Sequence, residues 1–287
     1  MEVLANIFRR IANKAVRRSS RLFEIGGYQV VAANYNSPIP QSSELGDDLF
    51  SSKSDCVGID WNIPIQEKYL AQVFPKYFSE VKLYENPWLS PIDGSILYAM
   101  IRHHKPKKMV EIGSGYSTGI AASAMLKNEP CESKREFVAI DPNPRSTLLI
   151  ETPGLSKIIQ KPVQEIDLEE IIDCDLLFID SSHIVKMGGD VNYEILEIVP
   201  RLKPGAIVHW HDILLPGEYW KEWVTRDHNF WTEQYLLQSF LQFNQEFEII
   251  WASRYMSLNR TDAIQFAFPS FTPDESRISS FWIRRNS

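Results

Sequence analysis

The sequence predicts an α/β fold with a doubly wound, mostly parallel sheet, and three observations indicate it. From residue 108 onward, short apolar runs alternate with stretches of helical composition, which is the pattern of parallel strands joined by crossover helices. Glycines follow the first of these runs and an aspartate follows the second. The chain also has 287 residues, 44% of them hydrophobic, which is enough to build a large buried core.

The expected elements follow in chain order. Two helices come first, one over residues 65–83 and one that begins after Ser90-Pro91 and ends near His104. Six apolar runs are predicted as parallel strands: Met109–Ile112, Phe137–Ile140, Lys157–Ile159, Leu176–Ile179, Ala206–Trp210 and Phe247–Trp251. Three segments between them have helical composition: Thr118–Lys127, Asp190–Leu202 and Trp231–Asn244. A last run, Phe281–Ile283, follows a stretch without a clear crossover helix, so we expect it to enter the sheet antiparallel.

The first 90 residues are predicted to form a basic arm and a cap, and residues 91–287 the main domain. Residues 1–23 hold six Lys or Arg side chains against one acid, and apolar residues recur at helical spacing from Val3 to Ile11. This pattern indicates a basic amphipathic helix, suited to peripheral binding of an anionic membrane or to contact with a second copy of the chain. Residues 27–62 have little periodicity, which indicates an irregular cap.

Composition excludes several classes of protein. Thirty basic and 37 acidic side chains give a net charge of −7, which argues against an extended nucleic-acid interface. Three widely spaced cysteines fit neither a disulfide framework nor a CxxC zinc site, and so favour a reducing compartment. No apolar run approaches the ~20 residues that span a bilayer, and the N-terminus lacks the apolar core of a secretion signal. We therefore expect a soluble, cytoplasmic protein.

A glycine-containing turn follows the first predicted strand. It reads Glu111-Ile112-Gly113-Ser114-Gly115, and Asp141 stands at the end of the second strand, where a carboxylate can accept hydrogen bonds from two ribose hydroxyls. Both a dinucleotide site and an S-adenosyl-methionine (SAM) site have this arrangement. The dinucleotide fingerprint needs a third glycine three residues after the second, and Thr118 stands there. The dinucleotide fingerprint therefore fails.

This turn resembles the E/D-x-G-x-G signature of class I SAM-dependent methyltransferases, although Ser117 stands where many members have a third glycine. The resemblance implies a Rossmann-like seven-stranded sheet of order 3-2-1-4-5-7-6 with an antiparallel seventh strand. It also implies SAM as the cofactor, bound by Glu111, Gly113, Ser114, Gly115 and Asp141. Further segments resemble a bacterial small-molecule subgroup: Leu177–His183, Leu202–Gly205, His211–Ile213 and Ser280–Ile283.

Four polar side chains follow the fourth and fifth strands and suggest how the acceptor is activated. Methyl transfer to a hydroxyl needs a base or a metal to remove the proton. By resemblance in placement to metal-dependent catechol-type methyltransferases, Asp180, His211 and Asp212 would hold a divalent ion such as Mg or Fe. His183 would be the general base, with Asp180 and His183 as the catalytic pair. His211 departs from that group, which has a carboxylate there. The alternative is that these are hydrogen-bonded loop residues.

Three functions remain open from the sequence. The leading one is a SAM-dependent methyltransferase acting on oxygen of a small-molecule acceptor. The second is a non-heme metal oxygenase or hydroxylase on the same scaffold, because two His and two Asp residues could supply a metal site. The third is a catalytically silent adenosyl-binding protein. An aromatic group after the fifth strand would either line the acceptor pocket or pack an extra helix: Tyr219, Trp220, Trp223, Phe230, Trp231 and Tyr235.

Overall fold

The chain forms two compact units, which we describe separately. A computed structural model describes residues 2–81, 88–128, 135–145, 152–273 and 276–286, and for residues 2–9, 13 and 17 it describes the backbone alone. Unit 1 comprises residues 1–50 and 221–230, and unit 2 comprises residues 51–220 and 231–287.

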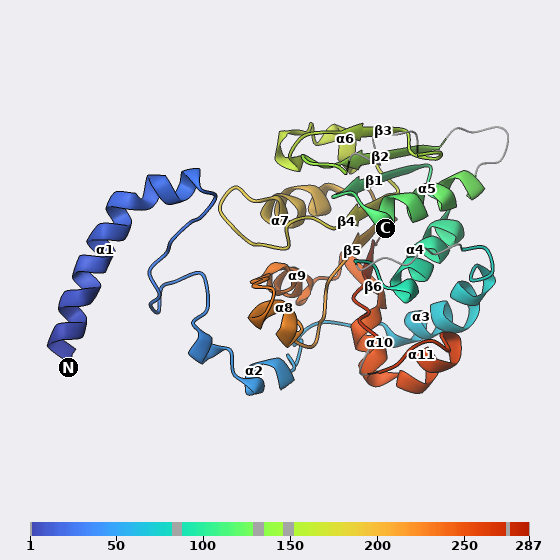
Figure 1. Cartoon of the computed structure of the whole chain (residues 1–287). Helices are drawn as coiled ribbons and strands as arrows, with labels where there is room; N and C mark the ends of the chain where they lie inside the picture. The colour runs from blue at the N-terminus through green and yellow to red at the C-terminus, as the bar shows by residue number, and fades with distance from the viewer. Residues whose placement is uncertain (1, 82–87, 129–134, 146–151, 274–275, 287) are drawn as a thin grey trace. The chain divides into compact units, whose positions relative to one another are not determined.

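Unit 2 is built on a seven-stranded sheet of order β3-β2-β1-β4-β5-β7-β6 (Figure 1). The strands are β1 Lys108–Ile112, β2 Glu136–Ile140, β3 Lys157–Ile159, β4 Leu176–Ile179, β5 Ile207–Trp210, β6 Phe247–Ala252 and β7 Phe281–Arg285. Neighbours are parallel, except that β7 runs antiparallel to both β5 and β6. This order and the antiparallel seventh strand confirm the predicted fold.

Helices cover both faces of this sheet because its strands are apolar on both faces. Successive side chains of a strand point to opposite sides, so Met109 and Val110 of β1 enter different cores. One core contains residues of α4 (Pro91–His104), α5 (Tyr116–Asn128), α10 (Ser253–Asn259) and α11 (Thr261–Ala267). The other contains residues of α7 (Asp190–Tyr193) and α9 (Glu233–Leu241). The loops that follow the parallel strands are thereby left at one edge of the sheet.

The helical segment before α4 belongs to unit 2. It begins with α3 (Ile63–Lys68) and continues as a π turn (Tyr69–Val73) and a 3-10 turn (Phe74–Lys76). It ends at Lys76, with Pro75 inside its last turn, and is therefore shorter than the predicted helix over 65–83. Residues 82–83 lie outside the described part. Tyr69, Val73 and Phe74 are buried in the same core as α4 and α5. The described part of residues 51–81 therefore packs in the same core as the sheet. The boundary expected after residue 90 stays a prediction.

The remaining helices are short, except the first. They are α1 Glu2–Ile25, α2 Asp47–Ser51, α6 Glu169–Ile172 and α8 Lys221–Thr225. In unit 1, α1 has 24 residues, and an ion pair joins Lys221 of α8 to Asp47 of α2. Among the described residues, no helix combines the length and apolar character needed to cross a membrane.

Candidate active site at the carboxyl edge of the sheet

Gly113 lets the end of β1 approach the end of β4. Its backbone is left-handed, with φ of +84°, and a Cβ built on it would lie 1.9 Å from the carbonyl oxygen of Asp180. Only glycine fits such a contact and such a φ without strain. The glycine therefore serves the packing of two strand ends, while Gly115 has open space around its Cβ position.

Ser114 and Asp141 are hydrogen-bonded to each other across the ends of β1 and β2. The backbone N–H and the hydroxyl of Ser114 both donate to Asp141 Oδ2, at 2.9 and 2.6 Å. The N–H of Asn143 donates to Asp141 Oδ1 at 2.7 Å. These bonds fix the carboxylate at the rim of a cleft of about 360 Å³. The cleft is lined by Ile112, Gly113, Ser114, Ile140, Asp141, Pro142, Pro162, Val163, Gln164, Asp180, Ser181, Ser182, Lys186 and Asp190.

Glu111 does not line this cleft. Its side chain is fully buried, and the hydroxyl of Ser117 donates to its Oε1 at 2.7 Å. Burial raises the pKa of Glu111 to about 8, against the hydrogen bonds from Ser117 and Thr118 that lower it. Thr118 Oγ1 also accepts the N–H of Gly115 at 2.9 Å. Ser117 and Thr118 stand where the sequence patterns have glycine. Their hydroxyl groups bond to Glu111 and to the N–H of Gly115, and these bonds stabilise the turn.

The four polar residues predicted after β4 and β5 come together. Nε2 of His183 lies 3.3 Å from Asp180 Oδ1 and 3.8 Å from Asp212 Oδ2. Nδ1 of His211 lies 3.2 Å from Asp212 Oδ1 and 3.8 Å from Asp180 Oδ1. One ligand atom each from Asp180, His183 and Asp212 lie within 4.8 Å of one another. The two carboxylates are therefore shared by two imidazoles, and His183 joins His211 as a candidate ligand.

The charges in this cluster stabilise one another. Burial acts to raise the pKa of Asp180, but His211 and the hydrogen bond to His183 outweigh it and lower that pKa to about 2. Burial likewise acts against protonation of the imidazoles, yet the neighbouring carboxylates raise the pKa of His211 to about 9 and that of His183 well above its usual value. The carboxylate of Asp180 is therefore ionised at neutral pH, as a metal ligand must be.

Strained backbone and buried hydrogen bonds position these side chains. His183 and Asp212 have φ of +59° and +58°, a conformation that non-glycine residues adopt mainly where the surroundings impose it. The hydroxyl of Ser279, just before β7, donates to Asp212 Oδ1 at 2.9 Å. The N–H of Ser279 in turn donates to the buried carboxylate of Asp93 at 2.9 Å. Because Ser279 lies just before the antiparallel β7, that strand places a hydrogen-bond donor for Asp212 at the carboxyl edge of the sheet.

Three residues near this edge were not singled out by the sequence. Lys186, between β4 and α7, and Asp190, the first residue of α7, line the cleft. Glu233, the first residue of α9, lies with its Oε2 2.8 Å from Nδ1 of His183. Fifty positions separate Glu233 from His183, and no local pattern marks such a pair. Of the aromatic group predicted near the acceptor, Trp231 lies against His183, with ring centroids 4.5 Å apart, whereas Tyr219 is buried.

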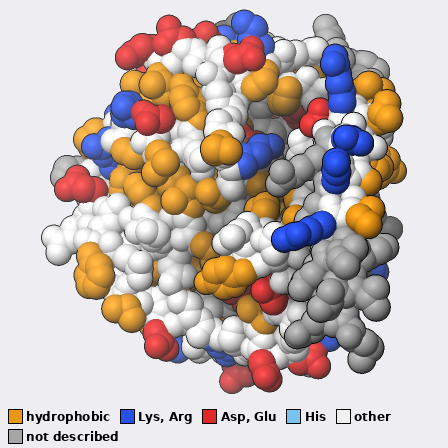
Figure 2. Space-filling view, turned by 90° about the vertical axis from the view of Figure 1, so that its left-hand side faces the viewer, with side chains coloured by type: hydrophobic (Ala, Val, Ile, Leu, Met, Phe, Trp, Pro, Cys, Tyr) orange, Lys and Arg blue, Asp and Glu red, His pale blue; other side chains and the backbone are white. Residues whose placement is uncertain are grey.

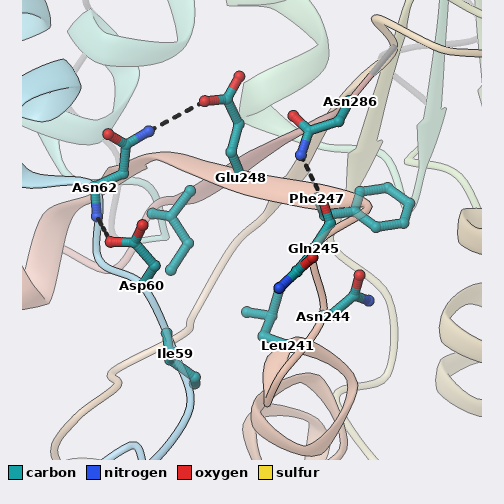
Figure 3. A pocket seen from close by; sticks show the side chains of 10 residues that line it. Ile59, Asp60, Asn62, Leu241, Asn244, Gln245, Phe247, Glu248 and Asn286 are labelled. Atoms are coloured by element: carbon teal, nitrogen blue, oxygen red, sulfur yellow. Dashed lines mark hydrogen bonds between the residues drawn. The ribbon is translucent and has the colours of Figure 1, made fainter.

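A second cleft of about 390 Å³ lies beside β6, at the edge of the sheet (Figure 3). Its wall is mostly polar, and the amide of Asn62 donates to Glu248 Oε2 across it at 3.1 Å. The N–H of Asn62 also donates to Asp60 Oδ1 at 2.8 Å. None of the site residues predicted from the sequence lines this cleft, so the chemistry is assigned to the cleft at Asp141 and Asp180.

The middle of the chain matches a known family. Residues 110–213, from β1 through the loop after β5, match the family model described as a methyltransferase domain. This segment therefore has the sequence features of a methyltransferase domain. The match spans Gly113, Asp141, Asp180, His183 and Asp212, and together with the strand order it confirms the predicted class I methyltransferase.

Other proteins resemble the methyltransferase domain and its surroundings. An uncharacterised protein of Archaeoglobus fulgidus is 29% identical over 154 residues, which are 47% of this chain and 69% of the relative. The SAM complex of the O-methyltransferase TomG from Streptomyces achromogenes is 13% identical, with a TM-score of 0.41, over 79% of this chain and 97% of TomG. The SAH-bound methyltransferase PaMTH1 of Podospora anserina is 16% identical, with a TM-score of 0.43, over 88% and 100% of the two chains.

Proposed function

We propose that the protein transfers the methyl group of SAM to an oxygen of a small-molecule acceptor. One observation carries this proposal: Asp180 lines the cleft that contains Asp141 and also belongs to the cluster with His183 and Asp212. A methyl donor in the cleft and an acceptor at the cluster would therefore be neighbours. Methyl transfer requires this proximity, because it is a direct displacement in which acceptor oxygen, methyl carbon and sulfur must align.

The cleft fits an adenosyl cofactor. Its volume of about 360 Å³ falls in the usual range of ligand pockets, roughly 300–1,000 Å³. The apolar side chains of Ile140, Pro142 and Val163 offer a surface for the adenine ring, and Asp141 offers carboxylate oxygens to the ribose hydroxyls. SAM bound there would supply an electrophilic methyl group. Asp141 and Ser114 bind and orient it.

The cluster fits a divalent cation. We assign Asp180, His183 and Asp212 as its ligands, because an oxygen–imidazole set suits such ions and because Nδ1 of His183 is supported by Glu233. Nε2 of His211, by contrast, is buried and has no hydrogen-bond partner. An ion held there would lower the pKa of an acceptor hydroxyl. With Nδ1 on Glu233 and Nε2 on the ion, His183 has no nitrogen left for the role of base.

The acceptor then loses its proton as the new bond forms. The acceptor oxygen attacks the methyl carbon, the carbon–sulfur bond breaks with its electron pair kept by sulfur, and the acceptor's proton leaves to solvent. The carboxylates of Asp180 and Asp212 would border the acceptor oxygen. Trp231 offers an aromatic surface next to His183, against which a planar acceptor can pack.

Isotope transfer tests this function. The full chain is expected to bind S-adenosyl-homocysteine (SAH) in calorimetry and to move a labelled methyl group from SAM to oxygen in a panel of phenols, catechols and hydroxylated metabolites with Mn²⁺ or Mg²⁺ present. Absence of SAH binding would refute the proposal. Binding without transfer to any acceptor would favour a silent adenosyl-binding protein, and oxygen consumption with Fe²⁺ would favour an oxygenase.

For α1 we propose peripheral binding to an anionic membrane surface. Four cations are exposed on this helix, Arg10, Lys14, Arg18 and Arg21, and Ile11, Leu22 and Ile25 are 64%, 72% and 78% exposed. At 3.6 residues per turn these three apolar residues share one face. Figure 2 shows Lys and Arg side chains in a column beside hydrophobic ones along this helix. The side chains of Val3, Ile7 and Phe8 lie outside the described part.

Truncation tests the arm. The full chain is expected to bind vesicles containing phosphatidylserine at low salt and to release them as salt rises, because exposed charges are screened over about 8 Å at physiological ionic strength. A chain that starts at residue 27 should not bind, and neutral phosphatidylcholine vesicles are the control. Equal binding of both chains would contradict the proposal. A change in oligomeric state on truncation, without vesicle binding, would assign the arm to self-association.

A further inference from the structure

We propose that Glu233 is a positioning residue for His183: its carboxylate holds the imidazole so that Nε2 faces Asp180 and Asp212. Glu233 Oε2 lies 2.8 Å from Nδ1, on the opposite side of the ring from the 3.3 and 3.8 Å contacts of Nε2. The inference rests on the proposed function, in which His183 binds the ion. It adds a residue from α9 that lies outside the segment matched by the methyltransferase family.

The first turn of α9 holds the backbone of His183 as well as its ring. The carbonyl oxygen of His183 accepts the N–H groups of Thr232 and Glu233 at 2.8 and 3.1 Å. The ring of Trp231 packs against the imidazole at 4.5 Å between centroids. Three consecutive residues thus hold one histidine in a left-handed conformation that it would not adopt unaided. The turn fixes where His183 sits, and the carboxylate fixes which way its ring faces.

The stability of the fold does not explain a carboxylate at this position. Glu233 is fully buried, and its other oxygen, Oε1, has no hydrogen-bond partner. A buried carboxylate with so few partners costs desolvation energy, which its place at the N-terminus of α9 offsets only in part. What the carboxylate supplies is an acceptor for Nδ1–H. In the neutral imidazole, which is the form that binds a metal ion, that bond leaves the lone pair on Nε2, the atom that faces Asp180 and Asp212.

Glu194 provides a matched control. It is also fully buried, it accepts one hydrogen bond, from Ser181 at 3.0 Å, and its Oε1 is likewise unpartnered. Burial raises the pKa of both glutamates. Of these two glutamates, however, Glu233 is hydrogen-bonded to the imidazole of His183, whereas Glu194 is hydrogen-bonded to Ser181. A substitution at Glu194 therefore repeats the loss of a buried acid without the loss of the imidazole's support.

Mn²⁺ titration of the full chain, followed by electron paramagnetic resonance, tests the inference. Glu233→Leu is expected to weaken Mn²⁺ binding by about 10–100-fold, the usual effect of removing a partner behind a metal ligand. Glu233→Gln keeps a hydrogen-bond acceptor and should lie between Glu233→Leu and the wild type. Glu194→Gln should bind Mn²⁺ as the wild type does. Unchanged SAH affinity in all three variants shows that each is folded.

Wild-type Mn²⁺ affinity in Glu233→Leu would overturn the inference, as would an equal loss in Glu194→Gln. If the wild type itself binds no Mn²⁺, the metal part of the proposed function fails, and a crystal structure of Glu233→Leu decides about Glu233 alone. An imidazole of His183 turned away from Asp180 and Asp212 would support positioning. An unmoved ring would refute it.

Discussion

His183→Ala is expected to lower the rate of methyl transfer by about 10²–10⁴-fold, because it removes a ligand of the ion that would lower the pKa of the acceptor hydroxyl. This is the usual range for the loss of assistance to proton removal. His183 is the residue on which the cluster converges, since Nε2 lies 3.3 Å from Asp180 and 3.8 Å from Asp212. SAH affinity should stay within about twofold of the wild type, because His183 does not line the cleft. Steady-state rates with a labelled methyl group, together with calorimetry, measure both effects.

Metal affinity in the same variant distinguishes the two roles of His183. If His183 is a ligand, His183→Ala weakens Mn²⁺ binding while His211→Ala changes it less. If His183 is instead the base and His211 the ligand, as the sequence predicts, His183→Ala keeps the wild-type affinity and His211→Ala loses it. His103→Ala, which removes an exposed histidine of α4, controls for the loss of an imidazole. Full activity of His183→Ala would show that the assignment of the cluster is wrong.

Asp141→Ala is expected to weaken SAH binding by about 10–100-fold. Hydrogen bonds to a charged acceptor are worth about 1.5–3 kcal/mol, and about 1.4 kcal/mol corresponds to a factor of ten. The substitution also frees the N–H and hydroxyl of Ser114, which both donate to Asp141. Gly115→Val should weaken SAH binding as well. The open space at the Cβ position of Gly115 lets the folded protein accept a valine, but the valine side chain would then occupy room that the bound cofactor needs. Isothermal titration with SAH measures both variants.

Asp60→Ala is the matched control for Asp141→Ala. Asp60 accepts the N–H of the residue two positions on, Asn62, as Asp141 accepts that of Asn143. It also lines a cleft of similar size, the one beside β6. Its replacement should leave SAH affinity unchanged. Wild-type affinity in both Asp141→Ala and Gly115→Val would contradict the cofactor site, and equal losses in Asp141→Ala and Asp60→Ala would show a general effect on the fold.

The sheet could be predicted from the sequence because its strands are short apolar runs, and the central ones, β1, β2, β4 and β5, are buried on both faces. The strands at Lys157–Ile159 and Leu176–Ile179 have the predicted limits, and the others differ by one or two residues. The helices between Ala252 and Phe281 could not be predicted. They are α10 and α11, of seven residues each. Each is too short to show a helical period in the sequence. Met256 of α10 and Ile264 of α11 are buried in the same core as α4.

The residues after each strand could be predicted as candidates because the carboxyl ends of parallel strands meet at one edge. Asp180 and Asp212 follow β4 and β5, which are hydrogen-bonded neighbours, so the sequence already placed their carboxylates close together. It also placed Ser114 and Asp141 at the ends of β1 and β2, which are neighbours too. The family match over residues 110–213 covers this same segment.

Only the tertiary structure decided the orientation of these side chains. The sequence by itself determined the strands and the edge at which the polar residues gather, because these follow from local patterns of a few residues. The strand order followed from the resemblance to class I methyltransferases, which rests on the glycine-containing turn and the segments after the strands. It did not determine that Gly113 serves the contact with Asp180, that Glu111 is buried behind the turn, or that Glu233 supports His183 from 50 positions away. Such contacts depend on how loops and helices pack in three dimensions, and no local period or spacing records that packing.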